Sequence, residues 1–275
     1  MAETTAVVAR RAWGLLFFPV TQVSINGGQT PAVNSGLLAS SHSLGSAHIG
    51  IAAVSAVGGA IFLRTLSQLA SSAGNLPADF RCSFHHEPLA HYLEAIHKND
   101  WIRVSVLLKR SNELLARCGA KFCVTPDAAV QQVLELAGVG SAIPWVSMTD
   151  LVADQVSKDG HKRVAILGTD LVMNSSTFQI PLGLKGVQVQ IPNPEDCHEV
   201  DRIIFEELLY GKVVPKSLAF ASQLIAKLKY EKQCDAVILA SSEAPLLVDK
   251  ENSALPVYHA ADLLASAAIV RAAAL

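Results

Sequence analysis

The stretch Ala236-Val237-Ile238-Leu239-Ala240-Ser241-Ser242-Glu243-Ala244-Pro245-Leu246-Leu247 decides the fold of this chain. It joins a short apolar run, typical of a buried strand, to a polar segment and then to a second apolar run that follows a proline. Similar apolar runs alternate with amphipathic segments from His48 onwards. This alternation predicts an α/β protein with parallel strands, in which ligands bind beyond the carboxyl ends of the strands.

A first copy of the same plan occurs earlier in the chain. Residues 119–131 read Gly-Ala-Lys-Phe-Cys-Val-Thr-Pro-Asp-Ala-Ala-Val-Gln, again a strand that leads into a polar segment. Ile51 and Ile166 lie 115 positions apart, and so do Pro126 and Ser241. A constant offset predicts two similar Rossmann-like lobes with parallel sheets, related by a pseudo-twofold axis, with one site in the cleft between them.

The remaining elements follow from hydrophobic period and from helix and strand breakers. Gly58 and Gly59 are expected to form a turn before a helix, and Gly119 is expected to cap a helix in the left-handed conformation. Strands are expected over 49–54, 80–84, 121–124, 163–167, 187–191 and 236–239, and helices over 60–69, 104–118, 200–208 and 218–230. The predicted domains are an N-terminal extension (1–46), a first lobe (47–145) against which a C-terminal helix (259–275) packs, and a second lobe (146–258).

The extension differs in composition from the rest of the chain. Glu3 is its only acid, Arg10 and Arg11 are its only bases, and serine and glycine recur in it. An organellar transit segment and a plain extension both fit this composition. The five cysteines are scattered and indicate reduced thiols inside a cell. The expected location is therefore cytoplasmic, or plastid or mitochondrial if the extension is a transit peptide.

Composition excludes several classes of function. The chain is 51% hydrophobic and 17% charged, which suits a globular protein with a substantial core. Lys and Arg number 22 against 24 Asp and Glu, without a basic block, so nucleic-acid binding is not expected. No apolar run reaches the roughly 18 residues of a membrane span. The cysteines and histidines lack metal-ligand spacing, so no metal site is expected.

Both quoted stretches resemble the active-site motifs of the aspartate/glutamate racemase family. Residues 236–247 are similar to the family's second motif, a strand followed by Gly-Cys-Thr-Glu and then Leu-Pro-Leu-Leu. Residues 119–131 resemble its first motif, a Gly-Ala-Asp strand leading into Pro-Cys-Asn-Thr-Ala-His. Further similarities extend the resemblance over roughly 48–272, and they lie at 49–51, 143–146, 164–169 and 203–212. The resemblance implies a homodimer that acts without a cofactor on a small amino-acid-like or dicarboxylic acid.

The sequence departs from the family at the positions that carry the chemistry. Asp127 replaces the first catalytic cysteine, and Ser241 replaces the second. Gln131 stands in place of the family's histidine, and His259 falls on a late aspartate of the family. By resemblance, Asp127, Ser241 and His259 are the candidate catalytic residues. The alternative for His259 is a polar residue at the start of a helix.

Five more residues are candidates for substrate binding. Thr169 and Ser242 are expected to hold a ligand carboxylate, because hydroxyls and backbone N–H groups at helix starts bind anions. Glu243 is retained from the family motif and either contacts the ligand or orients its loop. Ser55 follows the first strand and His86 follows the second. The alternatives are ordinary helix capping for Ser241 and Ser242 and a solvated loop for His86.

The loss of both thiols removes the symmetric racemisation mechanism, which needs an acid and a base on opposite faces of the reacting carbon. A serine hydroxyl at Ser241 is a far weaker acid than a thiol and has no evident activating base beside it. Asp127 can still serve as an acid or a base if burial raises its pKa. One competent face suits a double-bond shift, an elimination, a decarboxylation or a tautomerisation.

Two further functions stay open at the level of sequence. The first is a catalytically silent relative that binds a ligand or an active paralogue. The second is a two-lobed binding protein of the periplasmic type, against which the lack of a convincing secretory signal argues. Asp127 and His259 are titratable groups at former site positions and favour an enzyme.

Overall fold

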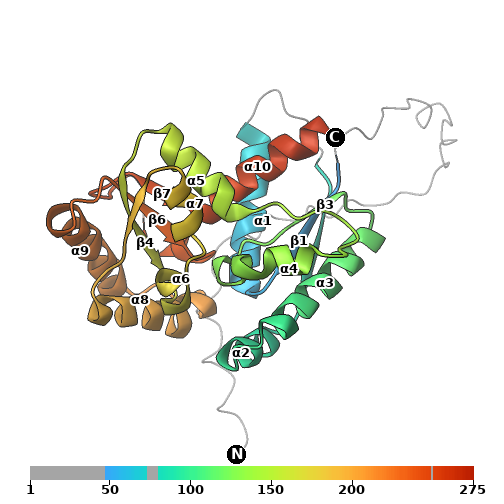
Figure 1. The fold of residues 1–275 in the computed structure, drawn as a ribbon, viewed down its shortest axis with the longest axis horizontal. Coiled ribbons are helices and arrows are strands. Elements are labelled where there is room, and N and C mark those ends of the chain that lie inside the picture. Colours follow the sequence, from blue (N-terminus) through green and yellow to red (C-terminus); the bar gives the residue numbers. More distant parts are fainter. Residues whose placement is uncertain (1–46, 73–79, 249) are drawn as a thin grey trace, which may run out of the picture. The chain divides into compact units, whose positions relative to one another are not determined.

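The computed structural model describes residues 47–72, 80–248 and 250–275, and they belong to one compact unit (Figure 1). The predicted N-terminal extension, 1–46, lies outside the described residues. Two parallel sheets form the unit, with strand orders β2-β1-β3 and β5-β4-β6-β7. The predicted α/β architecture of two lobes with parallel sheets is therefore confirmed.

The first sheet is built around β1 (Ile49–Ala53), which is buried along its whole length and accordingly has an unbroken apolar sequence. It pairs with β2 (Cys82–His86) and β3 (Phe122–Val124). Chain segment 144–146 continues the sheet beyond β3, since the Cys123 N–H donates to Pro144 O at 2.8 Å. The helical segments of this half are α1 (Ala56–Ser72), α2 (Leu89–His97), α3 (Trp101–Arg117), η2 (Ala128–Val133) and α4 (Leu134–Gly138).

The second sheet repeats this order around β4 (Arg163–Gly168). Its neighbours are β5 (Gln188–Gln190) and β6 (Ala236–Ala240), and β7 (Val257–His259) lies beyond β6. The helical segments of this half are α5 (Met148–Lys158), α6 (Asp170–Asn174), α7 (Gln179–Leu184), α8 (Pro194–Glu206), η3 (Leu208–Tyr210), α9 (Pro215–Glu231), η4 (Ala244–Leu246) and α10 (Ala260–Ala274).

Helix α10 packs against α1 and α5 (Figure 1). Its buried face is rich in alanine, so neighbouring backbones can approach closely. The Ala47 N–H donates to Ala272 O at 2.9 Å, which joins the first described residue to the end of this helix.

The turn predicted at Gly58 and Gly59 is wrong, because both residues lie inside α1. Their role is close packing. A Cβ on Gly58 would lie 2.1 Å from Ser242 Oγ, and a Cβ on Gly59 would lie 2.5 Å from the ring of Phe84. The left-handed cap predicted at Gly119 is confirmed, with φ of 94°.

The pairing register corrects the constant offset between the lobes. Ile51 pairs with Val124, whereas Ile166 pairs with Ile238. The offset is therefore 115 between β1 and β4 but 114 between β3 and β6. Asp127, and not the proline before it, is the counterpart of Ser241. The predicted strand at 80–84 also shifts, since β2 begins only at Cys82.

Candidate active site

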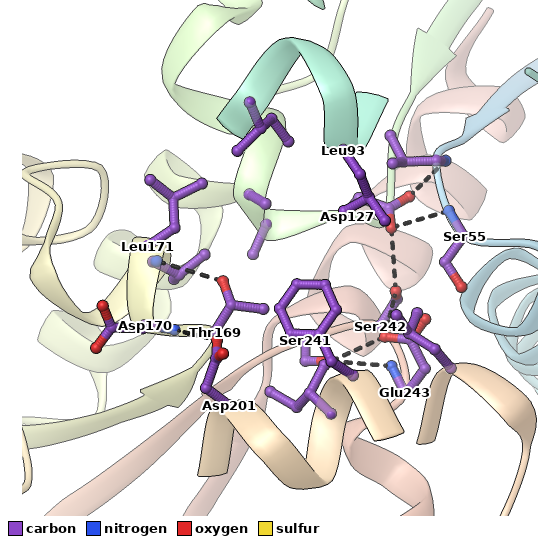
Figure 2. Close-up of a pocket in the computed structure, with 18 of the residues that line it drawn as sticks. Ser55, Leu93, Asp127, Thr169, Asp170, Leu171, Asp201, Ser241, Ser242 and Glu243 are labelled. Atoms are coloured by element: carbon purple, nitrogen blue, oxygen red, sulfur yellow. Dashed lines mark hydrogen bonds between the residues drawn. The ribbon is translucent and has the colours of Figure 1, made fainter. Parts of the chain in front are cut away.

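A cavity of about 280 Å³ lies where β1, β3, β4 and β6 end (Figure 2). Helices α2, α6 and α8 and the short segment η3 contribute most of the rest of its wall. Its lining combines leucine, isoleucine and phenylalanine side chains with a smaller polar group. The polar residues are Ser55, His97, Asp127, Thr169, Asp170, Asp201, Ser241, Ser242 and Glu243.

Asp127 directly follows the β3 end of the first sheet and is 8% exposed. Its carboxylate accepts hydrogen bonds from Val54 N at 2.9 Å, Ser55 N at 3.3 Å and Ser242 Oγ at 3.4 Å (Figure 2). Burial, and after it the negative charge of Glu243, raises the pKa of Asp127 from 3.8 to about 7, against the opposing effect of these hydrogen bonds. The carboxyl group is therefore present in both protonation states near neutral pH.

Glu243 accepts hydrogen bonds from both serines of the second motif. Its Oε2 accepts from Ser241 Oγ at 2.8 Å and from Ser242 Oγ at 3.0 Å. Among the described residues its Oε1 has no hydrogen-bond partner, although Glu243 is only 3% exposed. A carboxylate thus contacts the Ser241 hydroxyl, which the sequence prediction missed. The signal was present in the Ser-x-Glu spacing of the motif.

The second lobe contributes two carboxyl groups that the sequence analysis did not select. Asp170 follows Thr169 at the start of α6, and Asp201 comes from α8. The Asp201 carboxylate accepts a hydrogen bond from Asp170 N at 2.7 Å, and burial raises the pKa of Asp201. Thr169 caps α6, since its hydroxyl oxygen accepts from Val172 N at 3.4 Å.

Ser55 lines the cavity, and its hydroxyl oxygen caps α1 by accepting from Gly58 N at 3.1 Å. Two other predicted residues lie away from the cavity lining. His86 Nδ1 is 3.2 Å from Ala53 O, at the end of β2. His259 ends β7 and is 4% exposed, and its burial lowers its pKa from 6.5 to about 4. The structure thus brings Asp127 together with the second-motif residues and leaves both histidines outside.

The cysteines of the chain lie away from this cavity. All five cysteines are described, and none of them lines it. Cys123 is the nearest in sequence to Asp127, but burial raises its pKa to about 12, which keeps it a thiol. The described ranges contain no group of three His, Cys, Asp or Glu side chains suited to a metal ion, and no helix in them is long and apolar enough to cross a membrane.

Asp127 and Ser241 are equivalent strand-end residues of the two lobes, and both line one cavity. The protein is therefore of the two-lobed α/β class with a site shared between the lobes. Residues 49–268 match the sequence profile of the Asp/Glu/hydantoin racemases. The chain therefore belongs to this family.

Several solved structures share this fold. A candidate Asp/Glu racemase from Yersinia pestis is 23% identical, with 82% of this chain and 99% of that chain covered and a TM-score of 0.72. An aspartate racemase homologue from Pyrococcus horikoshii is 23% identical, with coverage of 82% and 98% and a TM-score of 0.71. Glutamate racemase from Francisella tularensis, solved with D-glutamate, is 17% identical, with coverage of 82% and 80% and a TM-score of 0.56. At these identities the likeness shows the fold alone.

Proposed function

We propose that this protein catalyses cofactor-independent proton transfer at a carbon next to a carbonyl group, with Asp127 as its single acid–base residue. One observation carries the proposal. The Asp127 carboxyl group lines the cavity while it is buried, and its pKa of about 7 lies near neutral pH. General acid–base catalysis is most effective when the pKa of the group lies near the working pH.

The hydrogen bonds around Asp127 provide a place for the transferred proton. The Ser242 hydroxyl lies 3.4 Å from Asp127 Oδ1 and 3.0 Å from Glu243 Oε2. A protonated Asp127 can donate to Ser242 Oγ, while Ser242 donates to Glu243. The proton is therefore held between two buried carboxyl groups until it returns to the substrate.

The position equivalent to Asp127 in the second lobe does not offer a matching acid. Ser241 donates its proton to Glu243 at 2.8 Å, so this proton does not point toward a ligand. A hydroxyl is also a weak acid. One-base reactions, such as a double-bond shift, an elimination or a decarboxylation, fit such a site better than racemisation of an amino-acid-like or dicarboxylic acid.

A catalytically silent relative that binds a ligand or an active paralogue is the second candidate. It is favoured by the three hydrogen-bond donors that already engage Asp127. These donors hold the carboxylate in place and compete with its use as a base.

Hydrogen–deuterium exchange at carbon distinguishes the two candidates. Amino acids, their amides and small dicarboxylates are incubated in heavy water and followed by NMR. Exchange is expected with the wild type and with Asp154→Asn, an exposed aspartate that pairs with Lys185 outside the cavity. It is expected to vanish with Asp127→Asn. Equal exchange in Asp127→Asn refutes the proposal, and absence of exchange with every compound supports the silent relative.

We also infer that the protein works inside a cell as a homodimer, from its scattered cysteines and its family. Mass spectrometry of the mature N-terminus tests whether a segment ending near residue 46 is removed. Light scattering tests the dimer.

A further inference from the structure

We infer that the cavity takes an apolar molecule that carries an ammonium group and a neutral carbonyl, such as an amide or ester, in place of a free carboxylate. The reacting carbon in this inference rests on the proposed function. The charge and polarity of the ligand rest on the cavity itself.

The ionisable side chains on the cavity wall are acidic, apart from one histidine. Four carboxyl groups line it, and they belong to Asp127, Asp170, Asp201 and Glu243. Among the described residues the lining includes neither lysine nor arginine, and its single histidine, His97, is exposed. A ligand carboxylate would be buried here without a fixed cation, which is costly, whereas an ammonium group would be paired.

An arginine beside this wall, Arg202, is already engaged. Arg202 lines a neighbouring hollow that shares Asp201 with the cavity. Its guanidinium donates to three glutamates at 2.8 to 3.2 Å, namely Glu199, Glu206 and Glu207. It is therefore not free to neutralise an anionic ligand.

Three backbone donors at the strand ends are already engaged. Helix starts present N–H groups that bind anions. In the first lobe, Val54 N and Ser55 N donate to Asp127, and in the second lobe Asp170 N donates to Asp201. The two turns are equivalent, since Ser55 and Asp170 are separated by the 115-residue offset of β1 and β4. In both lobes these N–H groups therefore bind a carboxylate of the chain itself.

The rest of the wall is apolar. Leu93 from α2 and Leu171 from α6 project from opposite lobes in Figure 2. They are accompanied by Leu89, Ile96, Ile204, Phe205 and Leu209. The volume of about 280 Å³ lies near the lower limit for small-molecule sites. An apolar side chain of modest size fits this wall better than the second carboxylate of a dicarboxylic acid.

A neutral carbonyl also suits a single carboxylate base. The Asp127 carboxylate would take the α-hydrogen as a proton, and the electron pair of the broken C–H bond would form a carbon–carbon double bond while the carbonyl oxygen gains the negative charge. A carboxylate substrate would have to accept a second negative charge, so its α-hydrogen is less acidic. Protonated Asp127 then returns the proton to carbon, and atoms and charge balance without a co-reactant.

The test compares phenylalaninamide with phenylalanine, which differ only in having a neutral amide or a carboxylate. Glutamate is included as a dicarboxylate. Binding is measured by calorimetry near neutral pH, so that it does not depend on turnover. The amide is expected to bind at least about tenfold more tightly than phenylalanine. Asp201→Asn is expected to weaken binding of the amide about tenfold, because it removes one wall charge. Glu195→Gln, which removes an exposed charge from α8 outside the cavity, should leave it unchanged.

Equal or tighter binding of phenylalanine or glutamate overturns the inference, and so does a failure of the amide to bind. Deuterium exchange on the bound amide is then measured separately. An amide that binds without exchange supports the ligand class and refutes the proposed proton transfer, so the two failures are distinguishable.

Discussion

Replacing Asp127 with asparagine should change the pH dependence of stability in a defined direction. The folded state raises the pKa of this carboxyl group from 3.8 to about 7. Between these values the folded protein holds a proton that the unfolded chain has released. The free energy of unfolding therefore falls as pH rises through this window, because the ionised group is held in a buried site.

The size of the effect follows from the same shift. A difference of about 3 pKa units corresponds to about 4 kcal/mol of unfolding free energy lost between pH 4 and pH 8. Asparagine resembles a protonated aspartate in shape and does not ionise. The variant should thus gain stability relative to the wild type across this range, and the relative urea midpoint should move by roughly 1–2 M.

Urea unfolding at several pH values, with Asp154→Asn as a matched surface control, measures this difference. The wild type and Asp127→Asn must be compared at each pH, because the titration of His259 changes the free energy of unfolding in the opposite direction. Its pKa is lowered from 6.5 to about 4, so its contribution to stability is lost as pH falls through that window. Parallel pH profiles for the wild type and Asp127→Asn would show that Asp127 titrates normally, and would refute the reasoning behind its role as a base.

Three further predictions test neighbouring parts of the structure. Gly58→Ala should destabilise the protein by about 1–3 kcal/mol in urea unfolding, because the new Cβ would collide with Ser242, whereas Gly183→Ala, with open space around it, should be neutral or slightly stabilising. His259→Gln should remove the loss of stability between pH 6.5 and 4. An equal fall in the free energy of unfolding between these pH values in the variant and the wild type would contradict a buried neutral histidine. Ser242→Ala removes a hydrogen bond that lowers the pKa of Asp127, so the pH profile of exchange should move to higher pH.

The sequence was sufficient to place Asp127 and Ser241 on a common cavity. Each follows a strand of a parallel sheet, and the carboxyl ends of β1, β3, β4 and β6 face this cavity. His86 was a candidate because it follows a strand, and His259 was a candidate because it falls on a late aspartate of the family. They end β2 and β7, which are outer strands of their sheets, and neither residue reaches the lining.

The acidic wall was not predictable in the same way. Asp201 belongs to α8, a helix whose neighbouring residues Val200, Ile203 and Ile204 predict a core-facing stripe. Its place in the site depends on how α8 packs against the sheet, and on the hydrogen bond from Asp170 N. The packing role of Gly58 could not be predicted for a similar reason, because its spatial neighbour Ser242 lies far away in the sequence.

The hydrogen bond between Ala47 and Ala272 brings the two ends of the folded unit next to each other. Adjacent ends are the condition under which a chain tolerates circular permutation. A short linker from residue 275 to residue 47, with new termini opened in an exposed loop, should therefore preserve both sheets and the cavity. Such a permuted chain would allow the two lobes to be placed on separate fragments and reassembled, so that each half of the site could be labelled independently.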